Sequence, residues 1–140
     1  MLSLSVVTPA GVVLQQQVDE VTVPGLLGEF GILPGHIALL AATRAGVVSY
    51  RSGSERGRIA IAPGFAEVDG KDGVVAMSQR ATRANKIDRA AAESLLQDAD
   101  ARLAKADGKA GAAAPLPPAE RAKAEADRAW AQAQLDALRS

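Results

Sequence analysis

Side chains that could carry out covalent chemistry or bind a metal ion are scarce in this sequence of 140 residues. It has no cysteine, which excludes disulfides and thiol nucleophiles, and its one histidine, His36, cannot form a histidine-rich metal site. No serine or threonine has a visible base and orienting partner. The neighbouring acids Asp19 and Glu20, and likewise Asp98 and Asp100, fit solvated turns and helix faces. We therefore expect no enzymatic activity, no catalytic residue, no metal and no cofactor.

Charge and hydropathy exclude further classes of protein. Lysine and arginine number 16 together, as do aspartate and glutamate, so the formal net charge is zero. Nucleic-acid-binding proteins and polybasic membrane anchors usually carry a basic excess, and we expect neither here. The longest apolar run, residues 37–42, is far shorter than the roughly 18 residues of a membrane-spanning helix. The amino terminus lacks the features of a signal peptide. We expect a soluble cytoplasmic protein that reaches a membrane only through a partner.

The composition changes near residue 80 and predicts two parts. Every valine lies between Val6 and Val75, and the first 80 residues hold 29 large apolar residues against eight in the remainder. Alanine shows the opposite bias, with nine residues before position 81 and 21 after it. Valine favours strands and alanine favours helices. We therefore expect a β-domain over residues 1–84 and a helical part over residues 85–140.

Short alternating segments separated by turn residues fill the first part. Leu2, Leu4 and Val6 alternate with outward positions, which is typical of a strand with one buried face. The expected strands cover residues 2–7, 12–14, 21–23, 37–42, 47–51, 58–62, 65–69 and 74–78. Strands at this spacing without helices between them predict an antiparallel β-sandwich or flattened barrel.

Helical periodicity begins after residue 84 and predicts an antiparallel two-helix hairpin. Asn85 is the expected cap of the first helix and Asp88 an acid in its first turn. An Ala- and Pro-rich linker near 107–118 precedes a second helix from Pro118 to about residue 139. The expected apolar faces are Ile87, Ala91, Leu95, Ala99, Leu103 and Ala106 on the first helix, and Ala122, Ala126, Trp130, Ala133 and Ala137 on the second. With so few large apolar residues, this hairpin must lean on the sheet or on a partner, and we expect it to be movable.

The least generic stretch is residues 24–36, which contain glycine at positions 25, 28, 31 and 35 and end in His36. From the residues alone we expect two linked turns in which these glycines, Gly31 among them, supply positive φ. A phosphate-binding loop is excluded because neither of the usual glycine-rich patterns is present.

Taken together, residues 28–36 (Gly-Glu-Phe-Gly-Ile-Leu-Pro-Gly-His) resemble the G-E-x-G-[IV]-L-P-G-H signature of the ε subunit of F-type ATP synthases. The resemblance continues at residues 21–25 and 63–68 and in the change from strands to an Ala-rich hairpin. It implies a non-catalytic rotor subunit, whose sandwich packs beside the γ subunit and touches the ring of c subunits. The implied contact residues are Gly28, Glu29, Phe30 and Gly31, with His36 near that surface.

The same resemblance implies that the subunit couples proton-driven ring rotation to γ and to the α/β catalytic head. It also implies a peripheral position at the cytoplasmic face of the cell inner membrane, with no direct membrane insertion and no nucleic acid. The hairpin resembles a regulatory arm that either folds against the sandwich or extends into the head and stops ATP hydrolysis. Basic residues that could then meet acidic segments are Arg89, Arg102, Lys105, Arg121, Lys123 and Arg128.

Some members of this family bind ATP through an I/L-D-x-x-R-A pattern at the start of the hairpin. Ile87 and Asp88 match it, but Ala91 occupies the place of the arginine. Because a guanidinium supplies the fork that binds phosphate, we expect weak ATP binding or none. An alternative to the rotor subunit is a stand-alone β-sandwich module that senses a small ligand such as a nucleotide. Co-purification with γ distinguishes the two.

Overall fold

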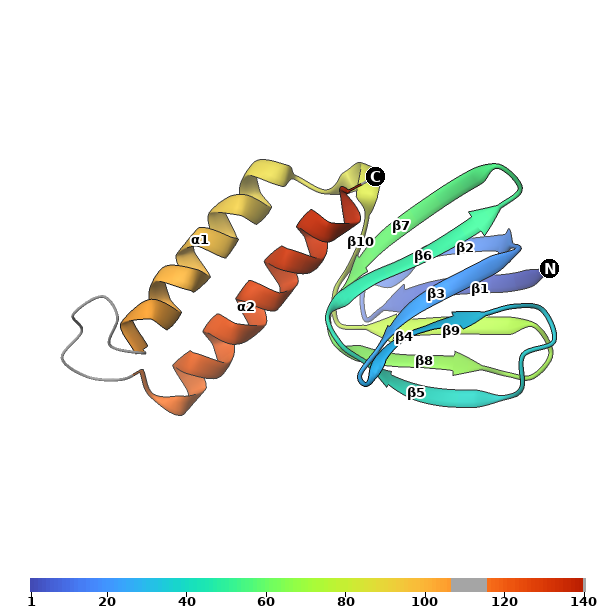
Figure 1. Ribbon diagram of the computed structural model, residues 1–140, viewed down its shortest axis with the longest axis horizontal. Coiled ribbons are helices and arrows are strands. Elements are labelled where there is room, and N and C mark those ends of the chain that lie inside the picture. Colours follow the sequence, from blue (N-terminus) through green and yellow to red (C-terminus); the bar gives the residue numbers. More distant parts are fainter. Residues whose placement is uncertain (107–115, 140) are drawn as a thin grey trace.

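A strand-rich body and a helical hairpin make up the residues described by the computed structural model, 1–106 and 116–139 (Figure 1). The strands are β1 (Leu2–Thr8), β2 (Gly11–Val18), β3 (Glu20–Gly25), β4 (Gly28–Ile32), β5 (Leu39–Thr43), β6 (Gly46–Ser52), β7 (Glu55–Ile61), β8 (Gly64–Val68), β9 (Gly73–Ser78) and β10 (Ala81–Arg83). A 3-10 turn, η1 (Ala84–Lys86), leads into helices α1 (Arg89–Ala106) and α2 (Pro118–Ala137).

The strands form two layers. One layer has the order β10-β7-β6-β3 with β4 beside β3, and the other has the order β5-β8-β9-β1-β2. The layers are joined where Gly25 of β3 pairs with Thr43 of β5, and β10 contacts β1 and β2 on the opposite side. The predicted β-sandwich or flattened barrel followed by two helices is therefore confirmed.

One pairing departs from the expected antiparallel pattern. β1 pairs with β9 in parallel, with Ser3 opposite Gly73 and Val7 opposite Met77. Parallel neighbours need a long connection, which residues 9–72 supply, and no local hairpin fixes the relative direction of these two strands.

The space between the layers is filled by the inward side of each strand. Leu2, Leu4 and Val6 of β1 are fully buried, as their alternation predicts, and they share the core with Val21, Val23, Ile32, Val48, Ile59, Ile61 and Val74. Side chains that alternate along a strand bury one face against the opposite layer.

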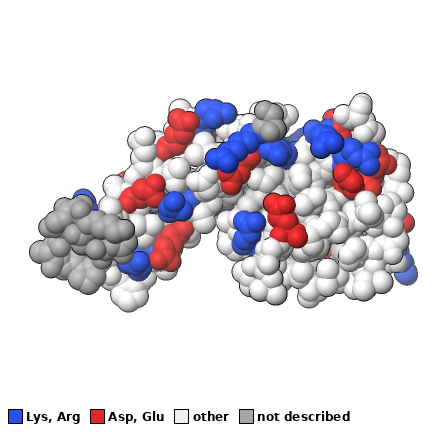
Figure 2. Space-filling model, in the orientation of Figure 1, with Lys and Arg blue, Asp and Glu red and all other residues white. Residues whose placement is uncertain are grey.

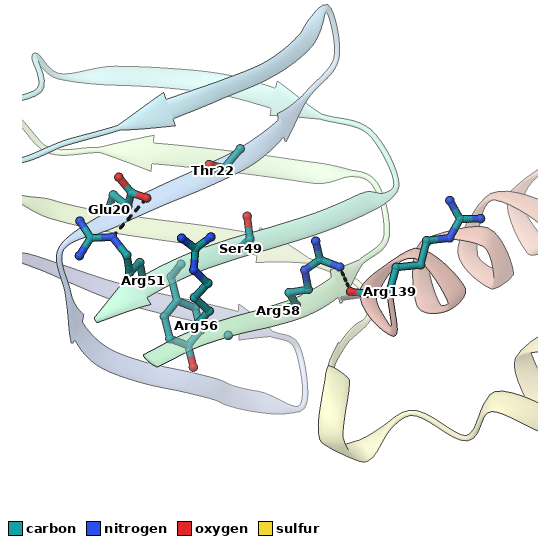
Figure 3. Close-up of a pocket in the computed structure, with 9 residues that line it drawn as sticks. Glu20, Thr22, Ser49, Arg51, Arg56, Arg58 and Arg139 are labelled. Atoms are coloured by element: carbon teal, nitrogen blue, oxygen red, sulfur yellow. Dashed lines mark hydrogen bonds and ion pairs between the residues drawn. The ribbon is translucent and has the colours of Figure 1, made fainter. Parts of the chain in front are cut away.

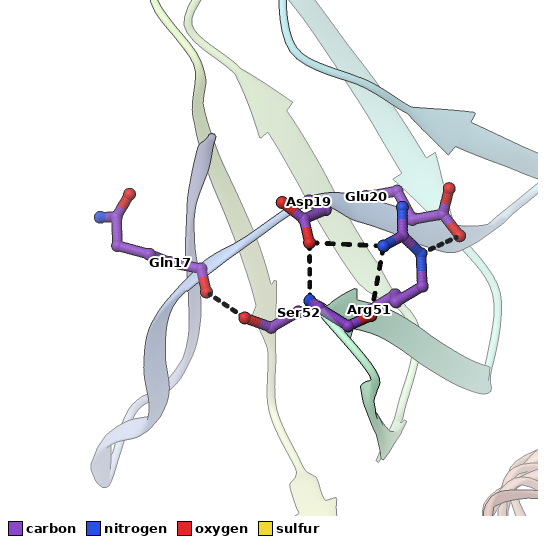
Figure 4. A network of polar contacts seen from close by, with 6 residues as sticks. Gln17, Asp19, Glu20, Arg51 and Ser52 are labelled. Atoms are coloured by element: carbon purple, nitrogen blue, oxygen red, sulfur yellow. Dashed lines mark hydrogen bonds and ion pairs between the residues drawn. The ribbon is translucent and has the colours of Figure 1, made fainter.

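A polar network fastens the corner between β2 and β3 to the turn between β6 and β7 (Figure 4). Asp19 Oδ2 accepts a hydrogen bond from the Gly53 N–H at 2.7 Å and lies 3.4 Å from Arg51 Nη1. Arg51 Nε lies 3.5 Å from Glu20 Oε1, and Ser52 donates its hydroxyl to the Gln17 carbonyl. Asp19 lies in a bend, and the side chains of Asp19 and Glu20 are 34% and 44% exposed, in keeping with the expected solvated turn. Arg51, 32 residues after Asp19, pairs with both carboxylates, which no local pattern reveals.

Helix α1 begins one turn later than expected, because residues 84–86 form η1. Asp88 is the capping residue: its Oδ1 accepts the Ala91 N–H at 3.1 Å and its carbonyl accepts the Ala92 N–H. Asn85 is not the cap, and Asp88 lies before the first turn of the helix. Pro118 does begin α2, as predicted. The expected linker falls mainly on residues 107–115, outside the described residues.

The buried faces of the two helices differ in part from the expected stripes. Ala92 and Ala99 are buried in α1, whereas Ala91 is exposed. In α2 the buried residues are Ala124, Asp127, Ala131, Ala133 and Ala137, whereas Ala122 and Ala126 are exposed. A single stripe assumes one packing partner, but α2 contacts α1 and also β6 and β7, so its buried surface is wider and rotated.

Ion pairs link the helices at the level of Asp127, whose side chain is only 11% exposed. Its Oδ2 accepts Arg102 Nη2 of α1 at 2.9 Å and Lys123 Nζ at 3.0 Å, and Arg128 Nε pairs with Asp100 Oδ1 at 2.7 Å. The hydrogen bond from Arg102 is the main reason that the pKa of Asp127 lies below its ordinary value, against the opposing effect of burial. Several basic residues expected to meet a partner are thus engaged within the hairpin.

Helix α2 docks on the outer face of β6 and β7 through small side chains. Ala133 and Ala137 are buried against Ala60, with Val47, Ala84, Ile87 and Trp130 around them. The Arg80 guanidinium lies 5.9 Å from the centre of the Trp130 ring, a cation–π geometry. Arg58 Nη1 donates to the Asp136 carbonyl at 3.2 Å and to the Arg139 carbonyl, which places a positive charge at the helix C-terminus.

The Asp127 network predicts that acid weakens the hairpin. Because the folded-state pKa is depressed, the carboxylate contributes full stability above its unfolded pKa of about 4, and this contribution is lost as the pH falls through the folded value. Asp127→Asn should destabilise the helices by about 1–3 kcal/mol at neutral pH and flatten the acid dependence.

The measurement is urea unfolding followed by circular dichroism over a pH series. Asp100→Asn is the control, because its pair with Arg128 is about half exposed and should change stability by less than about 1 kcal/mol. Equal effects of the two substitutions would contradict the special role of Asp127.

Candidate functional site

Residues 24–36 contain the two expected turns, at 26–27 and 34–35, and the strand β4 joins them. β3 pairs with β4 from Val21 opposite Ile32 to Gly25 opposite Gly28, leaving Leu26 and Leu27 as a two-residue turn. β4 was not expected, because its sequence, Gly-Glu-Phe-Gly-Ile, holds two glycines and shows no alternation. Tertiary pairing with β3 overrides that weak local preference.

The four glycines of this stretch have different structural roles. Gly28 has φ +138° and Gly35 has φ +86°, backbone conformations that side chains of L-residues rarely adopt. At Gly25 the constraint is space, since an added Cβ would lie 2.6 Å from the Gly28 carbonyl oxygen. Gly31 has neither constraint, and the expectation of positive φ is wrong for both Gly25 and Gly31. In a strand the Gly31 position is simply an exposed residue.

The structure groups most of the residues implied by the resemblance but not all of them. Gly28, Glu29, Phe30 and Gly31 lie together on β4, where Phe30 packs against the main core and the other three are exposed. Glu29 lines a hollow together with Arg44, Arg58 and the end of α2. His36 follows the other end of β4, beyond a strand about 13 Å long.

The loop that carries His36 is held by the β8–β9 loop. The Gly35 N–H donates to Asp72 Oδ1 at 2.7 Å, and His36 Nδ1 lies 2.7 Å from the Ile37 carbonyl oxygen. Asp69 shapes the β8–β9 loop, because its Oδ1 accepts the N–H groups of Lys71 and Gly73 at 2.6 and 2.9 Å. These backbone hydrogen bonds, led by that of Lys71, lower the pKa of Asp69. His36 and Glu29 therefore belong to opposite ends of the sandwich (Figure 1).

A surface that sequence reasoning missed crosses the outer face of the second layer. Ala42, Phe65, Met77, Val7 and Val12 stand opposite one another on β5, β8, β9, β1 and β2, and we call them the apolar row. Phe65 is 52% exposed and Val12 62% exposed. Phe65, Met77 and Val7 also line a groove of about 420 Å³. The sequence did contain a signal for this surface: these strands carry apolar residues at their outward positions as well as at their inward ones.

A second apolar surface lies at the β3–β4 turn. Leu26 and Leu27 are 64% and 103% exposed, and they border a hollow of about 360 Å³ shared with Phe30 and Leu39. Contiguous apolar surface of this kind marks sites of interaction with other proteins.

The residues that match the ATP pattern have structural roles. Ile87 packs into the cluster beneath α2, and the Asp88 carboxylate caps α1. Ala91, in the place of the arginine, is exposed. Within the described ranges, no group of three or more His, Asp or Glu side chains is arranged to hold a metal ion. Over the same residues, α1 and α2 both lack the length and apolar character that a membrane-crossing helix requires.

The fold and these surfaces define a small β-sandwich with a helical hairpin whose exposed features suit contact with other chains. The family model described as "ATP synthase, Delta/Epsilon chain, beta-sandwich domain" matches residues 1–84. ATP synthase epsilon chain 2 of Syntrophotalea carbinolica is 44% identical over 102 residues, 73% of each chain. The ATP synthase epsilon chain of Synechococcus sp. (strain WH7803) is 38% identical over 139 residues, 99% of this chain and 92% of that one.

Solved structures show the same fold. A chain in the cryo-EM structure of Euglena gracilis mitochondrial ATP synthase (OSCP/F1/c-ring) superposes with a TM-score of 0.77 at 22% identity, covering 99% of this chain and 81% of that one. A chain of the Tetrahymena thermophila central stalk and c-ring gives 0.60 at 15% identity, covering 99% and 96%. The protein belongs to the ATP synthase ε chain family and is a non-catalytic subunit.

The glycine conformations predict unequal effects of the same substitution on β4. Gly28→Ala should destabilise the protein by about 1 kcal/mol or more, because alanine is strained at φ +138°. Gly31→Ala is the matched control and should be nearly neutral, since an added Cβ at that position meets no atom within 4 Å. Urea denaturation of both variants checks this, and equal losses of stability would contradict the assigned backbone of β4.

Proposed function

We propose that this chain is the central-stalk subunit that links a rotating ring of c subunits to the γ subunit and thereby to the catalytic head. The observation that carries the proposal is the apolar row. Exposing the side chains of Phe65 and Val12 to water is unfavourable in free energy, and a partner that covers this sheet face would remove that penalty. Residues 1–84 supply these contacts, and residues 85–140 form the regulatory arm.

The γ subunit is the proposed occupant of the apolar row. The hairpin covers the opposite layer through β6 and β7, so the row stays open when the hairpin is docked. An aromatic ring flanked by Met77 and Val7 at the edge of a groove is the kind of anchor that dominates protein interfaces. This face therefore suits a permanent contact with the stalk.

The c-ring contact is proposed for Glu29 and its neighbours Gly28, Phe30 and Gly31. The Glu29 carboxylate is exposed and forms no hydrogen bond or ion pair with any described residue, so it is available to a lysine or arginine of a polar loop. His36, at the other end of β4, would make a separate contact. Leu26 and Leu27 add apolar surface beside Glu29.

The complex then holds the subunit at the cytoplasmic face of the inner membrane, as a peripheral component of a proton-driven machine. The relatives that support this are bacterial ATP synthase epsilon chains. ATP is not a proposed ligand of the hairpin, because the Asp88 carboxylate is committed to the helix cap and no arginine follows at position 91.

The hairpin is proposed to inhibit ATP hydrolysis when it leaves the sandwich. The buried residues of its docking surface are Ala133 and Ala137, with the larger Ile87 and Trp130 only partly buried beside them, and alanines bury little area. A docked and an extended state can therefore have similar free energies, as a switch requires.

The γ contact predicts that a charge in the apolar row prevents assembly. Phe65→Glu should leave the isolated subunit folded, because this side chain faces outward, but should lower recovery of γ and the catalytic subunits in a pull-down from membranes by at least about tenfold. Glu67→Lys, on the same face of β8 but outside the row, is the control and should assemble. Normal assembly of Phe65→Glu would contradict this contact. A wild-type chain that recovers no partner would favour the ligand-sensing module.

If the hairpin is an inhibitory arm, weakening its docking and deleting it should change the rate of ATP hydrolysis in different ways. Trp130→Ala should weaken docking of α2 by about 1–3 kcal/mol and lower the rate of ATP hydrolysis by the assembled complex, because more arms are extended. Deletion of residues 107–140 should leave hydrolysis equal to or above that of the wild type. Steady-state ATPase measurements compare the three, and identical rates would show that the arm has no regulatory role.

A further inference from the structure

A cationic groove of about 460 Å³ lies on the outer face of β3, β6 and β7, beyond the end of α2 (Figure 3). Cross-strand register explains why its residues converge. Ser49 faces Arg58, and Arg51 faces Arg56, on the outward side of β6 and β7. Thr22 and Glu20 of β3 stand opposite Ser49 and Arg51.

The same outward face changes character along the strands. Val47 and Ala60 pair under α2, where the surface is apolar and covered. Two and four cross-strand pairs further along, the outward residues of β7 are Arg58 and Arg56, and the face is open. Figure 2 shows Lys and Arg atoms along the upper part of the view, from the hairpin onto the strands, with Asp and Glu atoms among them.

The arginines of the groove differ in how far their charge is neutralised. Arg51 is paired with Asp19 and Glu20, at 3.4 and 3.5 Å, so these two carboxylates are engaged. Arg58 donates only to backbone carbonyls at the end of α2, which carry no full charge. Arg56 is exposed and has no hydrogen bond or ion pair with any described residue, which leaves Arg56 and Arg58 as cations without an anion.

We propose that this groove binds a phosphate-type oxyanion between Arg56 and Arg58. The two residues are two positions apart on the same face of β7, about 7 Å in the backbone, so their guanidinium groups can reach one tetrahedral group. Guanidinium forks match phosphate oxygens in bidentate pairs, and the hydroxyls of Ser49 and Thr22 supply further donors at the floor of the groove.

A compact ion fits this groove better than an acidic peptide. β6 is paired on both edges, with β7 and β3, so its backbone groups are used within the sheet. A peptide lying here would therefore find no strand edge for its own N–H and C=O groups, which must be satisfied when they lose water. Neither Ile87 nor Asp88 lines this groove.

The test is isothermal titration calorimetry of the full chain with sodium phosphate, pyrophosphate or ATP, against sodium chloride at equal ionic strength. We expect saturable phosphate binding with a dissociation constant of about 0.1–1 mM, and tighter pyrophosphate binding. Arg56→Gln should weaken binding by about tenfold without loss of thermal stability, because this side chain is exposed and forms no hydrogen bond or ion pair with any described residue. Arg89→Gln makes the same charge change at an exposed position outside the groove and should keep the affinity.

The order of affinities identifies the source of the phosphate. If ATP binds at least as tightly as pyrophosphate, the groove is assigned to nucleotide phosphates; if ATP binds more weakly, it is assigned to free phosphates. Either result supports the site, provided that the Arg56→Gln variant loses the binding. Absence of saturable binding would overturn the proposal, as would equal affinity of the Arg56→Gln and Arg89→Gln variants, or binding of an acidic peptide but no phosphate. None of these outcomes depends on assembly with γ, so the rotor function stands or falls separately.

Discussion

Apolar side chains on both faces of the same strands are the constraint on which this structure depends. The inward face of each layer is buried in the sandwich, as in any two-layered sheet. The outward face then needs a second cover. α2 provides it over Val47 and Ala60 of the first layer, whereas the apolar row on the second layer has no cover within the described chain. One layer is thus covered by the chain itself, and the outer face of the other is exposed in the described chain.

The sequence predicts the regular parts of this arrangement well. Alternation places Leu2, Leu4 and Val6 in the core, and the change from valine to alanine marks where strands give way to helices. Local pattern fails where tertiary pairing decides the outcome. β4 forms on two glycines because β3 offers it a partner, and the helix faces are rotated because α2 packs against two elements. Asp88 replaces Asn85 as the cap because a short 3-10 turn intervenes.

The contact residues that the signature implies stay a prediction, and their geometry was not visible in the sequence. The signature identifies Glu29 and His36 together, and the structure separates them by the length of β4. The partners of Asp19 and Arg58 lie 32 and 78 or more positions away, which no spacing rule reveals. The apolar row consists of five residues from five strands, and only the register brings them into line. Interaction surfaces built from cross-strand neighbours are in general less visible in a sequence than loops with a signature.

The composition of the two outer faces also fits the proposal that the contact with γ is permanent and that of the arm reversible. An interface anchored by Phe65 and Met77 removes large apolar areas from water, so separating it is costly. An interface of Ala60, Ala133 and Ala137 removes little apolar area from water per residue. The polar contacts beside it, between Arg80 and Trp130 and from Arg58 to the end of α2, can be replaced by contacts with water. The proposed switch requires that two arm positions differ by only a few kcal/mol, and a docking surface of small side chains is consistent with such a difference. A regulatory arm needs that narrow margin, because a partner can reverse the balance only by as much as it prefers one state.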